Sequence, residues 1–242
     1  MLGVAAAAGN QAIPQTPREN PGPRVRKCPA RKIRRVTNDW IRDRLIAEGV
    51  VPVLRLPDSE LTVRAIECLL DVGFGAIEVT MTTPDALDVI RAFAERTLVG
   101  AGTVLDLDTA GKCMQAGARF IVSPCVVPGL ARLVHATGHA VLIGGYTPTE
   151  VLAAHNEGAD IVKVFPASSG GPAHVAALHS VFPDIMLCPT GAVTAANMQS
   201  YFAAGATIIG VGNAIVPLKA LQAGDLEAVR SHAAAYRGSG TA

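Results

Sequence analysis

The chain has 242 residues, half of them apolar, and a formal net charge of +1 at pH 7. This length suits one large domain with an extensive core, and the near-neutral charge gives no general reason to expect nucleic acid or an anionic membrane as a partner. No apolar run reaches the roughly 18 residues of a membrane helix. The five cysteines are widely spaced without a CxxC pair, which indicates neither a disulfide framework nor a zinc knuckle and fits a reducing compartment.

Residues 1–36 differ in composition from everything after them. Pro, Gly, Ala and Asn come first, followed by the basic stretch RVRKCPARKIRR, with no hydrophobic period. Such a segment buries too little apolar surface to offset its ordering entropy, so we expect a disordered tail over 1–36 and a folded domain over 37–242. A targeting peptide and an anion-binding arm stay open as alternatives for the tail. The start MLGVAAAAGNQ lacks the positive region of a secretory signal, and we predict a cytoplasmic protein.

The folded domain begins with a predicted helix, NDWIRDRLIAEG, and continues with alternating strands and helices. Asn38 is the expected cap of this helix, and its apolar residues at helical spacing are Trp40, Ile41, Leu45 and Ile46. Eight short apolar strands follow, separated by about seven helical crossovers: 50–54, 75–80, 97–100, 119–123, 140–143, 160–165, 185–188 and 207–211. Four crossovers end in a glycine turn that leads into the next strand, as in DVGFGAIEV, which is typical of buried parallel strands. Eight repeats favour a closed (β/α)8 TIM barrel over an open doubly wound sheet.

The sixth strand, DIVKVF, carries a lysine at an otherwise apolar site. Lys163 shares a strand face with Ile161 and Phe165, and in a barrel one strand face lines the lumen. Desolvation favours a neutral amine, which is the form of lysine that attacks a carbonyl to give a Schiff base. The alternative is a structural lysine at a strand end or in a single ion pair.

Glu78 interrupts the second strand, AIEVT, in the same way. Schiff-base chemistry moves protons to and from the carbinolamine oxygen and the substrate carbon, and a carboxyl group with a raised pKa performs such transfers. Glu78 and Lys163 are therefore the predicted catalytic pair, although a purely structural buried ion pair would look the same in the sequence. The loops PTGAVTAAN and GVGNAIV, after the last two strands, predict an anion site.

The remaining polar residues indicate no further chemistry. The histidines show no HxH or HExxH pattern, so we expect no protein-bound metal and no cofactor. Asp106 and Asp108 are predicted to cap the helix after the third strand.

Seven stretches, in order, make the chain resemble the 2-keto-3-deoxy-6-phosphogluconate (KDPG) and 4-hydroxy-2-oxoglutarate (KHG) aldolase family from about Thr37 to Leu221. They are GVVPVLR, GFGAIEVTMTTPDAL, VGAGTVLD, AGARFIVSP, GADIVKVFPA, PTGAVTAANM and AGATIIGVGNAIV. The resemblance implies a metal-independent class I aldolase, a lyase of carbohydrate metabolism of the Entner–Doudoroff type. Its reaction would cleave a 2-keto-3-deoxy sugar acid or its phosphate to pyruvate and an aldehyde such as glyceraldehyde 3-phosphate or glyoxylate. The resemblance also implies a homotrimer.

The resemblance assigns roles to particular residues, with Lys163 as the Schiff-base lysine and Glu78 as the general acid/base. The implied substrate-binding residues are Thr103, Pro124 and Phe165 around pyruvate, Thr190 and Arg55 for its carboxylate, and Gly191, Ala192, Gly212 and Asn213 in the phosphate loops. Four positions depart from the family pattern: Ala192 replaces glycine, Asn213 replaces serine, Gly144 replaces proline and is expected to soften the loop after the fifth strand, and Thr82 stands where some members have arginine. These departures leave open which aldehyde is used and whether it carries a phosphate.

Two other functions remain as alternatives. The first is another enzyme on the same barrel, a sugar-phosphate epimerase or a 2-keto acid decarboxylase, in which Lys163 acts without a covalent intermediate. The second is a non-catalytic binder of small keto acids that has kept the barrel, with the altered phosphate loops as its best support.

Overall fold

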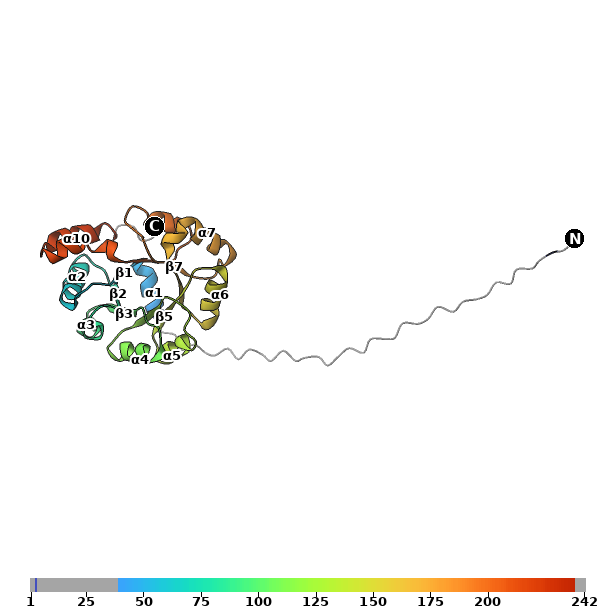
Figure 1. Cartoon of the computed structure of the whole chain (residues 1–242), viewed down its shortest axis with the longest axis horizontal. Helices are drawn as coiled ribbons and strands as arrows, with labels where there is room; N and C mark the ends of the chain where they lie inside the picture. The colour runs from blue at the N-terminus through green and yellow to red at the C-terminus, as the bar shows by residue number, and fades with distance from the viewer. Residues whose placement is uncertain (1–2, 4–38, 238–242) are drawn as a thin grey trace. The chain divides into compact units, whose positions relative to one another are not determined.

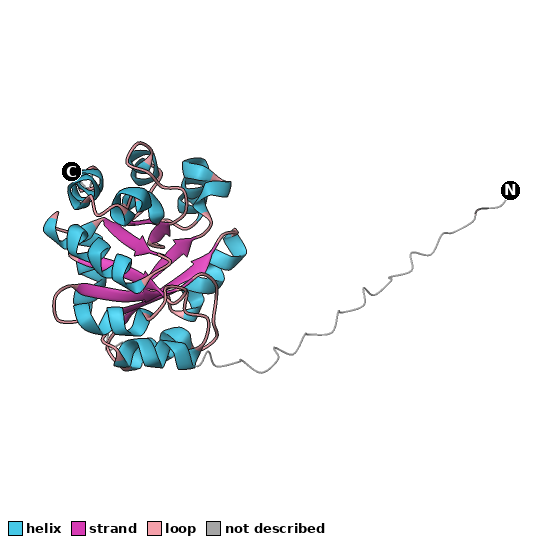
Figure 2. Ribbon diagram, turned by 60° about the vertical axis from the view of Figure 1, so that its left-hand side comes forward, coloured by secondary structure: helices cyan, strands magenta, loops and turns pink. Residues whose placement is uncertain are grey.

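The computed structural model describes Gly3 and residues 39–237, so the predicted tail, the Asn38 cap and the last residues of the predicted domain lie outside the described residues. Within residues 39–237, eight parallel strands alternate with helices and form the predicted (β/α)8 barrel. Neighbouring strands follow the order β7-β6-β5-β4-β3-β2-β1-β8, and a bridge between Thr190 and Gly210 connects the two ends of the sheet. The strands lie inside a ring of helices (Figures 1 and 2).

The strands begin and end within about two residues of their predicted bounds, which is the usual precision of such predictions. They are β1 Val50–Leu54, β2 Ala76–Thr80, β3 Leu98–Gly102, β4 Phe120–Ser123, β5 Ala140–Gly145, β6 Ile161–Val164, β7 Leu187–Pro189 and β8 Ile209–Val211. The α-helices are α1 Asp39–Glu48, α2 Ser59–Asp71, α3 Ala86–Phe93, α4 Leu107–Gln115, α5 Leu130–Ala136, α6 Pro148–Glu157, α7 Gly171–Val181, α8 Met198–Ala203, α9 Leu218–Gln222 and α10 Leu226–Ala234. Two 3-10 turns, η1 Ala167–Ser169 and η2 Asn213–Ile215, follow β6 and β8. Between residues 39 and 237 no helix is long and apolar enough to span a membrane.

Local signals in the sequence explain where the helices begin and end. The four predicted glycine turns all lie in the left-handed region: Gly73 at φ +88°, Gly117 at +104°, Gly158 at +114° and Gly205 at +97°. Residues with a Cβ rarely adopt this region, so glycine ends each helix and turns the chain into the next strand. Asp106 caps α4 as predicted, accepting a hydrogen bond from the Thr109 N–H at 2.7 Å. Asp108 lies within the first turn of that helix, so its predicted capping role is wrong.

Strand residues alternate between two apolar cores, one between the sheet and the helices and one inside the barrel. The inner core includes Val51, Ala76, Leu98, Phe120 and Ile161. Helix α1 lies at the centre of the ring in Figure 1 and adds the fully buried Ile41 and Leu45 to the same inner core. The prediction that Trp40 shares this apolar face is wrong: its side chain is 52% exposed, because one residue turns an α-helix by about 100° away from Ile41.

Candidate active site

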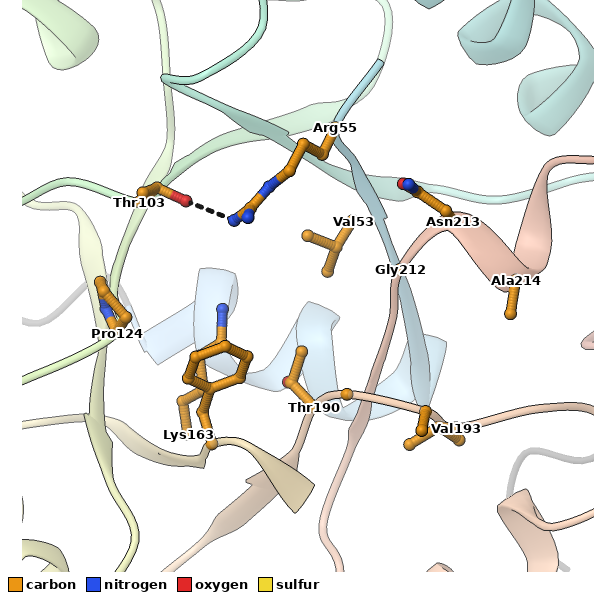
Figure 3. Close-up of a pocket in the computed structure, with 13 residues that line it drawn as sticks. Val53, Arg55, Thr103, Pro124, Lys163, Thr190, Val193, Gly212, Asn213 and Ala214 are labelled. Atoms are coloured by element: carbon orange, nitrogen blue, oxygen red, sulfur yellow. Dashed lines mark hydrogen bonds between the residues drawn. The ribbon is translucent and has the colours of Figure 1, made fainter. Parts of the chain in front are cut away.

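A cavity of about 490 Å³ opens where the barrel strands end, and all the predicted substrate-binding residues line it together with Lys163 (Figure 3). Its lining consists of Val53, Arg55, Thr103, Pro124, Lys163, Phe165, Thr190, Gly191, Ala192, Val193, Gly212, Asn213 and Ala214. These residues come from β1, β6 and the loops after most of the other strands. The carboxyl ends of parallel strands meet at one end of a barrel, so residues far apart in the chain converge there.

Three lining residues were missed by the sequence analysis. Val53 could have been found from strand alternation, since it lies two residues before Arg55 and shares its strand face. Val193 and Ala214 lie within the two loops predicted to bind an anion, although neither was named as a binding residue. No signal in the sequence separates these two from other apolar residues in loops.

Lys163 and Glu78 lie next to each other inside the barrel. The Lys163 Nζ is 3.7 Å from Glu78 Oε1, and the two residues are only 6% and 3% exposed. In Figure 3 the Lys163 amine points into the cavity. Glu78 is not among the lining residues, so its carboxyl group is adjacent to the amine without forming part of the open wall. A ligand that enters the cavity therefore reaches the Lys163 amine first, and the Glu78 carboxyl group lies directly behind it.

Burial determines the acidity of the groups around the lysine. Desolvation raises the pKa of Glu78, while the positive charges of Lys163 and Arg55 act in the opposite direction. Among the described residues Glu78 Oε1 has no hydrogen-bond partner, so it is available to a ligand that reaches the amine. Burial also raises the pKa of the Cys188 thiol to about 11, so this neighbour of Lys163 on β7 stays protonated and is not a competing nucleophile.

Glycines on the inner face of the barrel leave the space that two site residues occupy. A Cβ on Gly102 would lie 1.8 Å from Glu78 Oε1. A Cβ on Gly210 would lie 2.3 Å from Thr190 Oγ1. Real Cβ atoms do not approach other atoms so closely, so these glycines are required by the side chains opposite them.

Gly144 has a similar role, which corrects its sequence-based interpretation. It lies within β5, paired in register with Lys163, and not in the loop that follows the strand. A Cβ on Gly144 would lie 2.1 Å from the Pro124 carbonyl oxygen. Its effect in this chain is therefore to let the β4 end approach β5 closely, and the expected softening of the loop is wrong.

Arg55 and Thr103 form the upper edge of the cavity. The Arg55 Nη2 donates a hydrogen bond to Thr103 Oγ1 at 3.1 Å (Figure 3). Thr103 has φ +60°, a conformation that costs a residue other than glycine about 1–3 kcal/mol and that clusters at functional sites. Within residues 39–237 the guanidinium makes no other hydrogen bond, and its fork of N–H groups suits a carboxylate. Below them, the Phe165 ring centroid lies 5.6 Å from Lys163 Nζ.

The backbone of the loop after β7 has the conformation that glycine favours, although alanine stands at the last position of PTGA. Gly191 has φ +111° and Ala192 has φ +55°, so two successive residues lie in the left-handed region. The side chain of Asn197 braces this loop: its Nδ2 donates to the Ala192 carbonyl at 3.1 Å, and its Oδ1 accepts from the Thr194 N–H at 2.8 Å. Ala192 therefore adopts the backbone conformation that glycine would favour at this position.

A buried amine beside a carboxyl group, at the open end of a (β/α)8 barrel, defines an enzyme class that forms imines with carbonyl substrates. Within residues 39–237 no group of three or more His, Cys, Asp or Glu could hold a metal ion.

Comparison with known proteins identifies the family. The model of the KDPG and KHG aldolase family matches residues 41–232, and the chain belongs to this family. A probable 2-dehydro-3-deoxy-6-phosphogalactonate aldolase from Rhizobium meliloti is 34% identical over 73% of this chain and 85% of that protein. The KHG/KDPG aldolase of Escherichia coli is 33% identical over 74% of this chain and 86% of that protein. A KDPG aldolase from Legionella pneumophila, crystallised with pyruvate captured at low pH as a covalent carbinolamine, superposes with a TM-score of 0.73 at 28% identity, covering 79% of this chain and 95% of that one.

Proposed function

We propose that this chain cleaves a 2-keto-3-deoxy sugar acid of the KDPG or KHG type to pyruvate and an aldehyde, with Lys163 as the Schiff-base lysine and Glu78 as the general acid/base. The observation that carries the proposal is the 3.7 Å contact between the Lys163 amine and the Glu78 carboxyl group at the inner end of the cavity. Membership of the KDPG and KHG aldolase family supports it.

The reaction needs an amine and a proton carrier in contact. The neutral Lys163 amine attacks the C2 carbonyl, Glu78 gives a proton to the carbinolamine oxygen, and water leaves to form the iminium ion. Glu78, now ionised, takes the proton of the C4 hydroxyl, the C3–C4 bond breaks, and its electron pair passes into the iminium to give an enamine and the free aldehyde. Protonation of the enamine at C3 and addition of water to the imine then release pyruvate and restore the amine.

The pyruvate half of the substrate would lie against the inner wall of the cavity. We assign its carboxylate to Arg55 and Thr190, because a guanidinium fork and a hydroxyl suit a planar anion. Thr103, Pro124 and Phe165 would hold the pyruvyl carbons. The Arg55–Thr103 hydrogen bond supports this assignment, since it fixes the guanidinium above the amine before the substrate arrives.

The far end of the substrate would lie between the loops that follow β7 and β8. We assign a terminal phosphate or carboxylate to the backbone of Gly191, Ala192, Gly212 and Asn213. Gly191 and Gly212 support this, because residues without a side chain let the backbone approach the oxygens of an anion closely. Asn213 brings a larger amide than a serine would, so this half of the cavity is where the choice of aldehyde would be made.

Reductive trapping tests the proposal. The protein is incubated with pyruvate and sodium borohydride, and peptide mass spectrometry is expected to find a reduced pyruvate adduct on Lys163, since only an imine is fixed by reduction. Lys163→Met should abolish both the adduct and cleavage. Glu78→Gln should slow turnover by roughly 10²- to 10⁴-fold while leaving pyruvate binding nearly intact.

The same experiments separate the alternative functions. A folded protein that forms no adduct would favour a sugar-phosphate epimerase or a decarboxylase that uses no imine. An adduct without turnover of KDPG or KHG, measured by coupling pyruvate release to lactate dehydrogenase, would favour a keto-acid binder. Equal losses of turnover and pyruvate binding in Glu78→Gln would make Glu78 a structural residue.

We also propose, from the family resemblance, that the enzyme is a cytoplasmic homotrimer. Light scattering on the purified protein tests the oligomeric state, and a mass other than three chains would contradict it.

A further inference from the structure

The carbonyl of Ala214 is held from outside the cavity by two side chains of the C-terminal region. Ala214 lines the cavity, in the η2 turn after β8. The Tyr236 hydroxyl donates a hydrogen bond to its carbonyl oxygen at 3.0 Å, and the His232 Nε2 lies 2.8 Å from the same oxygen. A carbonyl only accepts, so both side chains are donors.

Tyr236 holds the turn without lining the cavity. Burial raises the pKa of its hydroxyl, which therefore stays protonated and donates to the Ala214 carbonyl. Tyr236 is absent from the cavity wall, so it contacts the η2 turn from outside the cavity.

The segment that carries Tyr236 is fixed to the barrel wall. Val229 and Ala233 of α10 are fully buried in the core between helices and sheet, and Tyr236 is 2% exposed. Arg230 pairs with Asp71 of α2 at 3.2 Å. The burial contributes most of the anchoring, because an exposed ion pair contributes little.

We propose that Tyr236 is a positioning residue, which fixes the η2 turn at the far end of the cavity and so determines how well the far end of the aldehyde is bound. His232 supports it by holding the same carbonyl. The consequence for the aldehyde rests on the proposed function, whereas the positioning of the turn does not.

Tyr236→Phe tests this inference because it removes the hydroxyl and keeps the ring. Hydrogen–deuterium exchange of the full-length protein should become faster in residues 212–215 and stay unchanged in β6, which carries Lys163. The KM for glyceraldehyde 3-phosphate in the condensation direction should rise about five- to tenfold, the factor that corresponds to about 1.0–1.4 kcal/mol for one lost hydrogen bond. The rate at which borohydride traps pyruvate on Lys163 should not change.

Tyr201→Phe is the matched control. Tyr201 is also 2% exposed, and its hydroxyl donates to a single backbone carbonyl, that of Ala167, at 3.4 Å. Ala167 does not line the cavity. This variant should leave both exchange in residues 212–215 and the KM for glyceraldehyde 3-phosphate at the wild-type values.

A double-mutant cycle with His232→Ala provides a second check. Each single variant leaves one donor on the Ala214 carbonyl, so the double variant should raise the KM by more than the product of the two single effects. Unchanged exchange in residues 212–215 of Tyr236→Phe would overturn the positioning role. A slower pyruvate trapping that accompanies the higher aldehyde KM would also overturn it, since the two together would show a general structural defect. Faster exchange in residues 212–215 of a protein that traps no pyruvate would instead contradict the proposed function and leave the positioning role standing.

Discussion

Replacing Gly102 by alanine would place a methyl group in the space that the Glu78 carboxyl group occupies. The new Cβ would lie 1.8 Å from Glu78 Oε1, 2.6 Å from Cδ and 2.8 Å from Cγ. Non-bonded heavy atoms are most stable about 3.5 Å apart, so the carboxyl oxygen would have to move by roughly 1.7 Å. Gly102 ends β3 and pairs in register with Thr80 of β2. This strand pairing holds the Gly102 backbone in place, so the Glu78 side chain must move.

The size of the expected effect follows from this displacement. Glu78 Oε1 is 3.7 Å from the Lys163 amine, so a shift of this size changes the contact between the two groups. A misplacement of about 1 Å in a reacting group costs on the order of 10²-fold in rate. Loss of general acid–base catalysis as a whole costs about 10²- to 10⁴-fold. We therefore expect Gly102→Ala to lower kcat by roughly 10²- to 10³-fold, and overpacking to lower the free energy of unfolding by about 1–3 kcal/mol.

Two measurements distinguish displacement of Glu78 from general damage. Pyruvate release from KDPG, coupled to lactate dehydrogenase, should fall, while borohydride should still trap pyruvate on Lys163. Gly111→Ala in α4 is the matched control, because a Cβ there meets nothing within 4 Å, and this variant should keep wild-type turnover. Turnover of Gly102→Ala within roughly threefold of the wild type would refute the reasoning, since the carboxyl group would then tolerate the displacement.

Three further predictions concern conformation, buried charge and thiol reactivity. Ala192→Gly should raise the free energy of unfolding by up to about 1 kcal/mol in urea titrations, because alanine is disfavoured at φ +55°, and a marked loss of stability would contradict this. Glu48→Ala should lower Tm by roughly 4–8 °C, the equivalent of about 2 kcal/mol, because the Gly75 N–H donates to the buried Glu48 carboxylate at 3.1 Å; an unchanged Tm would show that this bond is dispensable. Iodoacetamide at pH 8 should alkylate the exposed Cys125 and spare the buried Cys188, whose pKa is raised to about 11. Peptide mass spectrometry that finds both cysteines modified at similar rates would contradict the protection of Cys188.

The sequence predicts the barrel well because its signals are local and repeated. Each strand is a short apolar run, and four of the helices before a strand end in a glycine whose left-handed backbone the structure confirms. Lys163 and Glu78 stand out for a related reason, since a charge in a strand that is otherwise buried requires an explanation. The family resemblance supplies the roles of the other residues, all of which line one cavity with Lys163.

What the sequence could not provide depends on contacts between distant segments. Gly144 appeared to belong to a loop, because the pattern of apolar residues does not show that β5 extends to Gly145. Trp40 appeared to face the core, because the spacing of Trp40 and Ile41 alone does not show which stripe of α1 meets the barrel. The contact of Tyr236 with Ala214 joins segments whose relation only the folded chain defines.

The two halves of the cavity differ in how firmly the fold fixes them. Lys163, Glu78 and the glycines opposite them lie in paired strands, where a shift of one residue would turn every inner side chain outward. The half of the cavity in which we propose that the imine forms is therefore determined by the barrel itself. The far half consists of loops whose shape depends on side-chain hydrogen bonds, from Asn197 within the loop after β7 and from Tyr236 to the η2 turn after β8. Substitutions such as Asn213 can therefore change which aldehyde is accepted without altering the chemistry at the lysine. Of the departures from the family pattern, Ala192 and Asn213 lie in these loops, whereas Gly144 lies in β5 beside Lys163, where the missing side chain leaves room for the Pro124 backbone.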